Sequence, residues 1–86
     1  MPEISRFFGI IIRIFYSDHA PPHFHAAYGS AEAQIGINPI RVINGALPRR
    51  ALSLVLEWTA LHQQELLRDW QIASQELPPR PIDPLE

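Results

Sequence analysis

Residues 23–37 read HFHAAYGSAEAQIGI, two runs of strand-forming residues separated by Gly29-Ser30. Glycine at the first position of a two-residue loop suits a type II′ hairpin turn, which fixes how the two runs pair. Because side chains alternate along a strand, this pairing sorts them into two faces. The pairs expected on the apolar face are Tyr28/Ala31, Ala26/Ala33 and Phe24/Ile35, and those on the polar face are Ala27/Glu32, His25/Gln34 and His23/Gly36.

Further strands flank this hairpin along the chain. Residues 8–16 (FGIIIRIFY) are dense in β-branched and aromatic residues and predict a central strand, in which Arg13 points opposite to the isoleucines beside it. Whether Arg13 faces the histidines depends on a register that the sequence leaves open. Asn38-Pro39 interrupts the next run, and residues 40–43 predict a short edge strand because proline cannot donate to a ladder. Asn44-Gly45 then predicts a turn ahead of a helix.

Residues 48–75 show a helical pattern, with Pro48 suited to the first helical position, and predict one long helix or two collinear pieces. An apolar stripe on this helix is expected to face the sheet. Its members are Leu54, Val55, Trp58, Leu61, Leu66 and Ile72. Outside that stripe, Leu56, Leu67 and Trp70 are candidates for a second contact surface with a homodimer or another partner.

The predicted fold is therefore α+β, a three- to four-stranded mainly antiparallel sheet followed by one long C-terminal amphipathic helix packed on it. Residues 1–76 are expected to form a single domain. The tail, residues 77–86, carries four prolines and predicts either a loose end or an extended strap. Its apolar anchors would be Leu77, Ile82 and Leu85.

Composition narrows the class of protein. The chain has no cysteine, which excludes a disulfide scaffold and a thiolate zinc site. Its net charge is −2 and its seven basic residues are all arginine, so broad nucleic-acid binding is not favoured, although arginines can still bind phosphates or carboxylates locally. The N-terminal sequence lacks the pattern of a signal peptide, and residues 7–16 are too few to span a bilayer. We expect a cytoplasmic protein that does not interact with membranes.

Three of the four histidines lie within seven residues, His19, His23 and His25, and they follow Asp18. Imidazole is the commonest metal ligand and titrates near neutral pH, so this stretch is the first candidate for chemistry. His23 and His25 share one face of the predicted strand, a spacing from which two rings can bind one metal ion or one phosphate. A zinc site would need His19, Asp18 or His62 as a third ligand, and solvated surface histidines are the simpler interpretation.

A second use of the same residues needs no metal. One histidine among His19, His23 and His25 could act as general base and another as general acid, while Arg13 or Arg6 holds the phosphate of an RNA. These residues are the candidate catalytic set of a minimal ribonuclease.

The helical region offers two more candidates. His62 falls on the apolar side of the predicted helix, where a buried neutral imidazole with a hydrogen-bond partner is the preferred interpretation, and Glu65 and Asp69 are within reach. Arg49 and Arg50 lie in the first helical turn, where free amides and two guanidinium groups could bind a phosphate or a carboxylate. Two solvated arginines are an equally good interpretation.

The chain resembles the bacterial and archaeal domain-of-unknown-function family 4160 over nearly its full length. The resemblance rests on residues 4–10 (ISRFFGI), 18–19 (DH), 21–25 (PPHFH), 28–29 (YG), 47–51 (LPRRA), 56–58 (LEW) and 61–62 (LH). The family commonly has asparagine where this chain has Ala20. The resemblance implies a small cytosolic protein, often encoded beside another small protein in an arrangement suggestive of toxin–antitoxin pairs, and it supplies no activity.

Together these observations favour a small regulatory or interaction module that binds a partner protein or nucleic acid, or a second copy of itself. The expected binding residues are those of the histidine stretch and of the helix start, namely Asp18, His19, His23, His25, Arg49, Arg50 and His62. The alternatives are the metal-independent ribonuclease of the small toxin type and, third, a metal-binding protein using His19, His23 and His25. No cofactor is expected, and whether the protein is an enzyme stays open.

Overall fold

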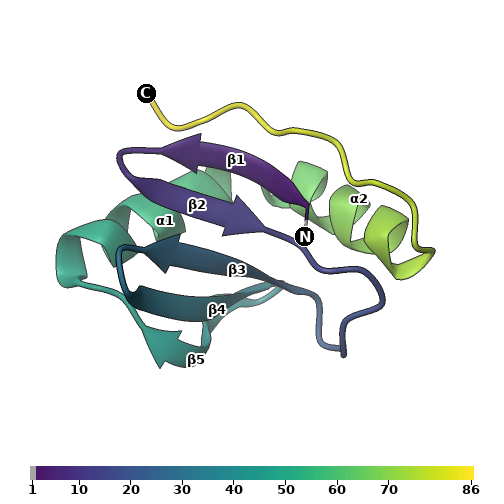
Figure 1. Cartoon of the computed structure of the whole chain (residues 1–86), viewed down its shortest axis with the longest axis horizontal. Helices are drawn as coiled ribbons and strands as arrows, with labels where there is room; N and C mark the ends of the chain where they lie inside the picture. The colour runs from purple at the N-terminus through teal and green to yellow at the C-terminus, as the bar shows by residue number, and fades with distance from the viewer. Residues whose placement is uncertain (1) are drawn as a thin grey trace.

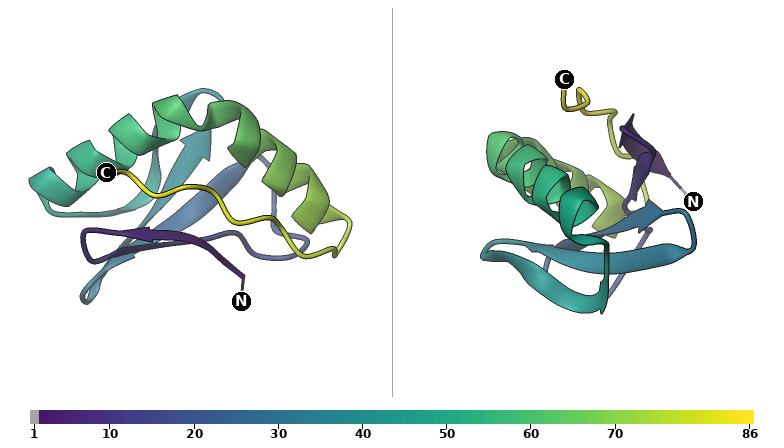
Figure 2. Two further views of the ribbon diagram at one scale, coloured as in Figure 1. Left: turned by 90° about the horizontal axis from the view of Figure 1, so that it is seen from above. Right: turned by 90° about the vertical axis from the view of Figure 1, so that its left-hand side faces the viewer.

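The computed structural model describes residues 2–86 and contains five strands, two helices and an extended tail (Figure 1). The elements are β1 (Glu3–Phe7), β2 (Ile10–Arg13), β3 (His23–Tyr28), β4 (Ala31–Ile37), β5 (Ile40–Ala46), α1 (Arg49–Leu61) and α2 (Gln63–Ser74). All strand pairs are antiparallel and the strands follow one another in sequence order across a single sheet. Both helices lie on one face of the sheet (Figure 2), which confirms the α+β class.

The central hairpin forms in the predicted register. Each of the six pairs expected between β3 and β4 is present. Gly29 adopts φ 59°, as a type II′ turn requires at its first central position. The apolar side of the hairpin is buried beneath the helices, with Phe24, Ala26 and Ile35 inaccessible to solvent.

The prediction of three to four strands was wrong because β1 and the turn that joins it to β2 were not recognised. Residues 8–16 do not form one strand: Phe8 and Gly9 have φ 51° and 82° and make the two-residue turn between β1 and β2. Positive φ at both central residues is typical of a type I′ turn, but phenylalanine is rarely found there, so the sequence did not reveal it.

The turn predicted at Asn44-Gly45 was also wrong, because this pair lies inside β5. The register between β4 and β5 shifts at Gln34/Ile35, so β5 carries a bulge, and Gly45 adopts φ 75° just beyond it. A Cβ on Gly45 would collide with the Glu32 carbonyl group. The edge position predicted from Pro39 is confirmed, since β5 is the last strand of the sheet.

The predicted long helix is divided at His62. This residue has φ −119° and ψ 24°, and its amide is shared between the carbonyl oxygens of Trp58 (3.1 Å) and Thr59 (3.3 Å). Thr59 is fully buried and its hydroxyl donates to the Val55 carbonyl at 2.6 Å, a bond that bends helices. Gln63 then donates to the Ile37 carbonyl at 2.7 Å and holds the start of α2 on the sheet. The two helices form an arch over the sheet (Figure 2).

The helical side chains are not all buried or exposed as expected. Leu61, expected in the buried stripe, is 66% exposed, and it is the last residue of α1. Leu56, Leu67 and Trp70, expected to form a separate contact surface, are partly buried against the core.

None of the helices among residues 2–86 combines the length and the apolar character needed to cross a membrane.

The tail is an extended strap that follows β1 (Figure 1). The Ile82 amide donates to the Ile4 carbonyl at 2.8 Å, and the Trp58 indole donates to the Asp83 carbonyl at 2.8 Å. Ile82 is 4% exposed and anchors the strap, whereas Leu77 is 52% exposed and does not. The strap therefore covers the outer edge of β1.

Asp69 fixes the beginning of the strap. Its buried carboxylate accepts the Arg80 amide at 3.0 Å, and Arg68 lies 3.3 Å from the same oxygen. The other oxygen is buried without a hydrogen-bond partner. Burial raises the pKa of Asp69 above its ordinary value, against the opposing effect of the Arg80 amide and Arg68.

Replacing the buried anchor of the strap should weaken the fold. We expect Ile82→Ala to lower the free energy of unfolding by about 2 kcal/mol or more, since the substitution leaves a cavity against the core. Leu77→Ala is the matched control in the same segment and should change it by less than about 0.5 kcal/mol. Urea denaturation measures both, and equal effects would show that the strap does not stabilise the domain.

The raised pKa of Asp69 predicts a pH-dependent contribution to stability. As pH falls from neutral toward the ordinary value of about 3.9, the folded state takes up a proton at Asp69 before the unfolded state does. The wild-type chain should therefore gain free energy of unfolding relative to Asp69→Asn as the pH falls. Urea titrations of both proteins at about pH 7 and about pH 5 test this, and a constant or shrinking difference would contradict it.

Candidate functional site

The loop between β2 and β3 is held at both ends by backbone hydrogen bonds. The Ser17 amide donates to the Ala73 carbonyl at the end of α2 (3.1 Å), and the Ile37 amide donates to the Pro22 carbonyl (3.1 Å). The loop is thereby fixed between α2 and β4, and its direction at Pro22 sets where His23 enters the sheet.

Asp18 lies between the two histidines of β3. Its Oδ2 atom is 3.0 Å from His23 Nε2 and 3.2 Å from His25 Nε2. Its other oxygen accepts the His19 amide at 2.8 Å. The side chains of Asp18, His23 and His25 are 20%, 6% and 13% exposed, so the cluster is largely buried yet reachable from solvent.

The far nitrogen of each ring also meets an acceptor. His23 Nδ1 lies 2.8 Å from the Pro21 carbonyl oxygen, and His25 Nδ1 lies 3.1 Å from the Glu32 carboxylate. A carbonyl oxygen can only accept, so His23 carries a proton on Nδ1. The acceptor at Nδ1 orients each ring so that its Nε2 atom points toward Asp18.

Aromatic side chains hold the rings in place. Trp70 of α2 packs against His23 at a centroid distance of 5.2 Å, and Phe15 meets His25 edge-on at 4.2 Å. The two imidazole centroids are 5.3 Å apart. Because neighbouring aromatic rings hold both imidazoles in place, the two side chains need to move little to bind a shared ligand.

The charge state of Asp18 follows from its neighbours. Burial opposes ionisation, but the His19 amide and the rings of His25 and His23 stabilise the carboxylate more strongly and lower the pKa of Asp18 below its ordinary value. Asp18 is therefore an anion at neutral pH.

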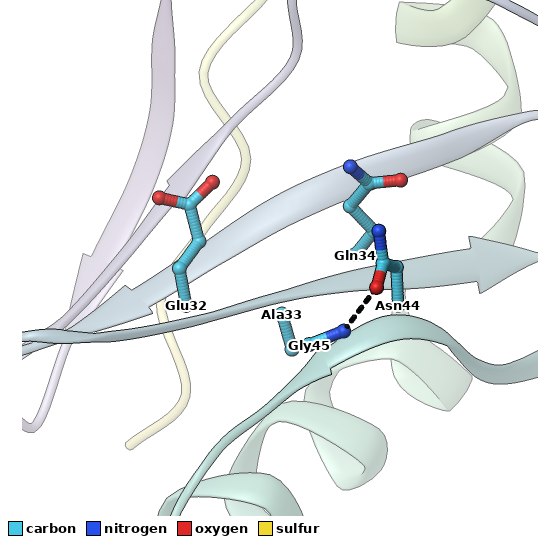
Figure 3. Close-up of a pocket in the computed structure, with 5 residues that line it drawn as sticks. All are labelled: Glu32, Ala33, Gln34, Asn44 and Gly45. Atoms are coloured by element: carbon cyan, nitrogen blue, oxygen red, sulfur yellow. Dashed lines mark hydrogen bonds between the residues drawn. The ribbon is translucent and has the colours of Figure 1, made fainter.

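The uncovered face of the sheet continues from this cluster. Arg13 is the cross-strand partner of His25, which answers the question of register that the sequence left open. Gln34 and Asn44 follow in the same row on β4 and β5, and they line a shallow pocket with Glu32 (Figure 3). Glu32 belongs to both the pocket and the His25 contact.

Sequence reasoning missed Glu32 and Trp70 as neighbours of the histidines. The hairpin register placed Glu32 opposite Ala27, two pairs along the ladder from His25 and on the same face, and this was the signal that could have identified it. Trp70 could not be found in this way, because it lies on α2 and the sequence does not show where that helix meets the start of β3.

Other predicted site residues lie elsewhere. His19 is exposed, and the group of ligand atoms within 4.8 Å of one another contains Asp18, His23 and His25 without it. His62 is partly buried and finds the predicted partner, Glu65, at 2.6 Å. Arg6 is exposed and paired with Glu3 at 2.8 Å.

Arg49 and Arg50 are exposed at the start of α1, at the opposite end of β3 from His23. Arg50 lines a small pocket together with Tyr28, the last residue of that strand. At about 3.3 Å per residue, the length of β3 separates the two ends by roughly 17 Å. The histidine cluster and the arginines are therefore two sites and not one.

The arginine end carries an apolar surface. Phe8 and Tyr28 are 58% and 41% exposed, and both line the pocket with Arg50. Pro48 and Leu54 complete its rim. We refer to Phe8, Tyr28, Pro48, Arg50 and Leu54 as the aromatic patch.

A family model described as domain of unknown function (DUF4160) matches residues 9–71 of the 86-residue chain. The chain belongs to this family. The DUF4160 match includes the histidine cluster and both arginines, whereas Phe8 lies immediately before it. No curated protein and no solved structure matches the chain.

Proposed function

We propose that this DUF4160 protein is a small cytosolic interaction module that binds a partner protein through the aromatic patch and the start of α1. The observation that carries the proposal is Phe8, a bulky side chain exposed on a turn whose backbone disfavours it. The family resemblance, which implies a second small protein encoded alongside, supports a protein as the ligand.

Phe8 stabilises the folded chain poorly. A non-glycine residue in a left-handed conformation costs roughly 1 kcal/mol or more, and aromatic residues are seldom found there. An exposed ring recovers little of that cost by burial within its own chain. A partner that covers the ring would supply the missing contact.

The residues around Phe8 have the composition of a binding hot spot. Tyrosine and arginine are enriched at the centres of protein interfaces, where they bury a large area beside a polar group. The Tyr28 ring lies beside Gly9, close enough that a Cβ on that glycine would crowd it. The patch therefore offers two exposed aromatic rings with a guanidinium at the rim.

The positive charge at the start of α1 indicates that the partner carries an acidic group. Within residues 2–86, neither Arg49 nor Arg50 forms an ion pair. The first turn of α1 contains no acidic residue, and Pro48 gives it no side-chain cap. These features favour a segment with an apolar side chain next to an aspartate or glutamate. A protein is a better match than nucleic acid, given the net charge of −2.

The substitution Phe8→Asn separates binding from folding. It creates the Asn-Gly pair that type I′ turns prefer, so the urea midpoint should stay the same or rise. Affinity for the product of the neighbouring gene, measured by calorimetry, should fall about tenfold or more. Arg50→Glu should also weaken binding, whereas Leu61→Ser, at an exposed leucine outside the patch, should not.

Three outcomes would contradict this proposal. They are the absence of a complex with the wild-type chain, a complex that tolerates both patch substitutions, and self-association of the wild-type chain that Phe8→Asn abolishes. The last would identify a second copy of the chain as the occupant.

Ribonuclease activity is a second candidate, and the adjacency of Arg13 and His25 favours it. Asp18 argues against a ribonuclease that works without a metal ion. An RNA phosphate placed at both Nε2 atoms would lie beside the negatively charged Asp18 carboxylate, which would repel it. In this alternative His25→Ala abolishes cleavage of a short single-stranded RNA in the presence of a chelator, and His19→Ala does not. Gel analysis of the products tests it, and absence of cleavage by the wild-type chain would exclude it.

A further inference from the structure

We propose that Asp18, His23 and His25 form a binding site for one divalent transition-metal ion, with zinc as the best match. The site lies at the opposite end of β3 from the aromatic patch and does not depend on partner binding. Three observations carry the proposal: the convergence of the ligand atoms, the acceptors behind both rings, and the choice of ligand types.

The ligand atoms already have nearly the spacing that a metal ion imposes. Zinc binds nitrogen and oxygen at about 2.0–2.1 Å, so two ligand atoms of a tetrahedral site lie about 3.3 Å apart. The distances from Asp18 Oδ2 to the two Nε2 atoms are 3.0 and 3.2 Å. All three atoms fall within 4.8 Å of one another, so small side-chain movements suffice to admit an ion.

The acceptors behind the rings are those that metal-binding histidines use. Histidines that bind metal usually donate their second N–H to a carbonyl or a carboxylate, which leaves the lone pair of the other nitrogen for the metal. The Pro21 carbonyl serves His23 in this way and the Glu32 carboxylate serves His25. Both Nε2 atoms therefore face the Asp18 carboxylate, and the three atoms can be held together by a proton on a ring nitrogen or by a metal ion bound to all three.

The ligand set narrows the choice of ion. Magnesium and calcium prefer sites made of oxygen atoms, whereas imidazole suits zinc and the other later first-row metals. Three protein ligands leave a fourth position for water, which is the pattern of an open site. A metal there would lower the pKa of the bound water and could bind an anion, and Arg13 lies beside it on the same face.

Calorimetric titration of the full chain with Zn²⁺ tests the proposal, with Co²⁺ absorption as a second readout of ligand geometry. We expect one ion per wild-type chain. Asp18→Asn and His25→Gln should abolish binding or weaken it at least tenfold, and Glu32→Gln should weaken it about tenfold by loosening His25. His19→Ala is the matched control, a neighbouring exposed histidine outside the cluster, and should bind as the wild type does.

Folding and binding are separated by two choices of variant. Circular dichroism checks each protein, and the partly exposed His25 provides a test even where Asp18→Asn disturbs the loop. Phe8→Asn should bind zinc normally, so a failure of the partner proposal leaves this one intact. Lack of Zn²⁺ binding by the wild-type chain would overturn the proposal, as would normal binding by folded His25→Gln or loss of binding in His19→Ala. The first result would mean that protons alone hold the cluster together.

Discussion

The side chain of Trp58 joins every layer of this domain. Its ring is fully buried and packs on Phe7 of β1 at 5.3 Å and on Phe24 of β3 at 5.8 Å. Its indole N–H donates to the Asp83 carbonyl of the tail, so one residue connects the sheet, α1 and the strap. A chain of 86 residues without cysteine has a thin core, and a large aromatic residue that also satisfies its polar group is an efficient way to close it.

Strand β3 then organises the chemistry by alternation. Phe24 and Ala26 contribute to the core beneath Trp58, while His23 and His25 project from the opposite side. The strand ends at Tyr28, in the aromatic patch. A single six-residue strand thus positions the core, a polar cluster at its beginning and an apolar surface at its end.

Sequence reasoning succeeded where one local rule decided the structure. Alternation and a glycine turn determine the β3–β4 register, and the same rule places His23 and His25 on one face. It failed where a residue departs from its usual role. Phe8 occupies a turn position that favours asparagine or glycine, and Gly45 lies inside a strand beside a bulge and not in a turn. The break at His62 depends on contacts of Thr59 and Gln63 that helical periodicity does not reveal.

The selection of Asp18 as the third member of the cluster required the tertiary structure. Sequence left His19, Asp18 and His62 as alternatives, because a loop containing Pro21-Pro22 can turn either neighbouring side chain inward. Anchoring of the loop at Ser17 and Pro22 turns Asp18 toward the histidines and leaves His19 exposed. A largely buried anion needs positive charge or hydrogen-bond donors close to it, and in the part of the chain that the structure describes only the two imidazoles and the His19 amide are near enough to supply them, so Asp18 and the two rings depend on one another.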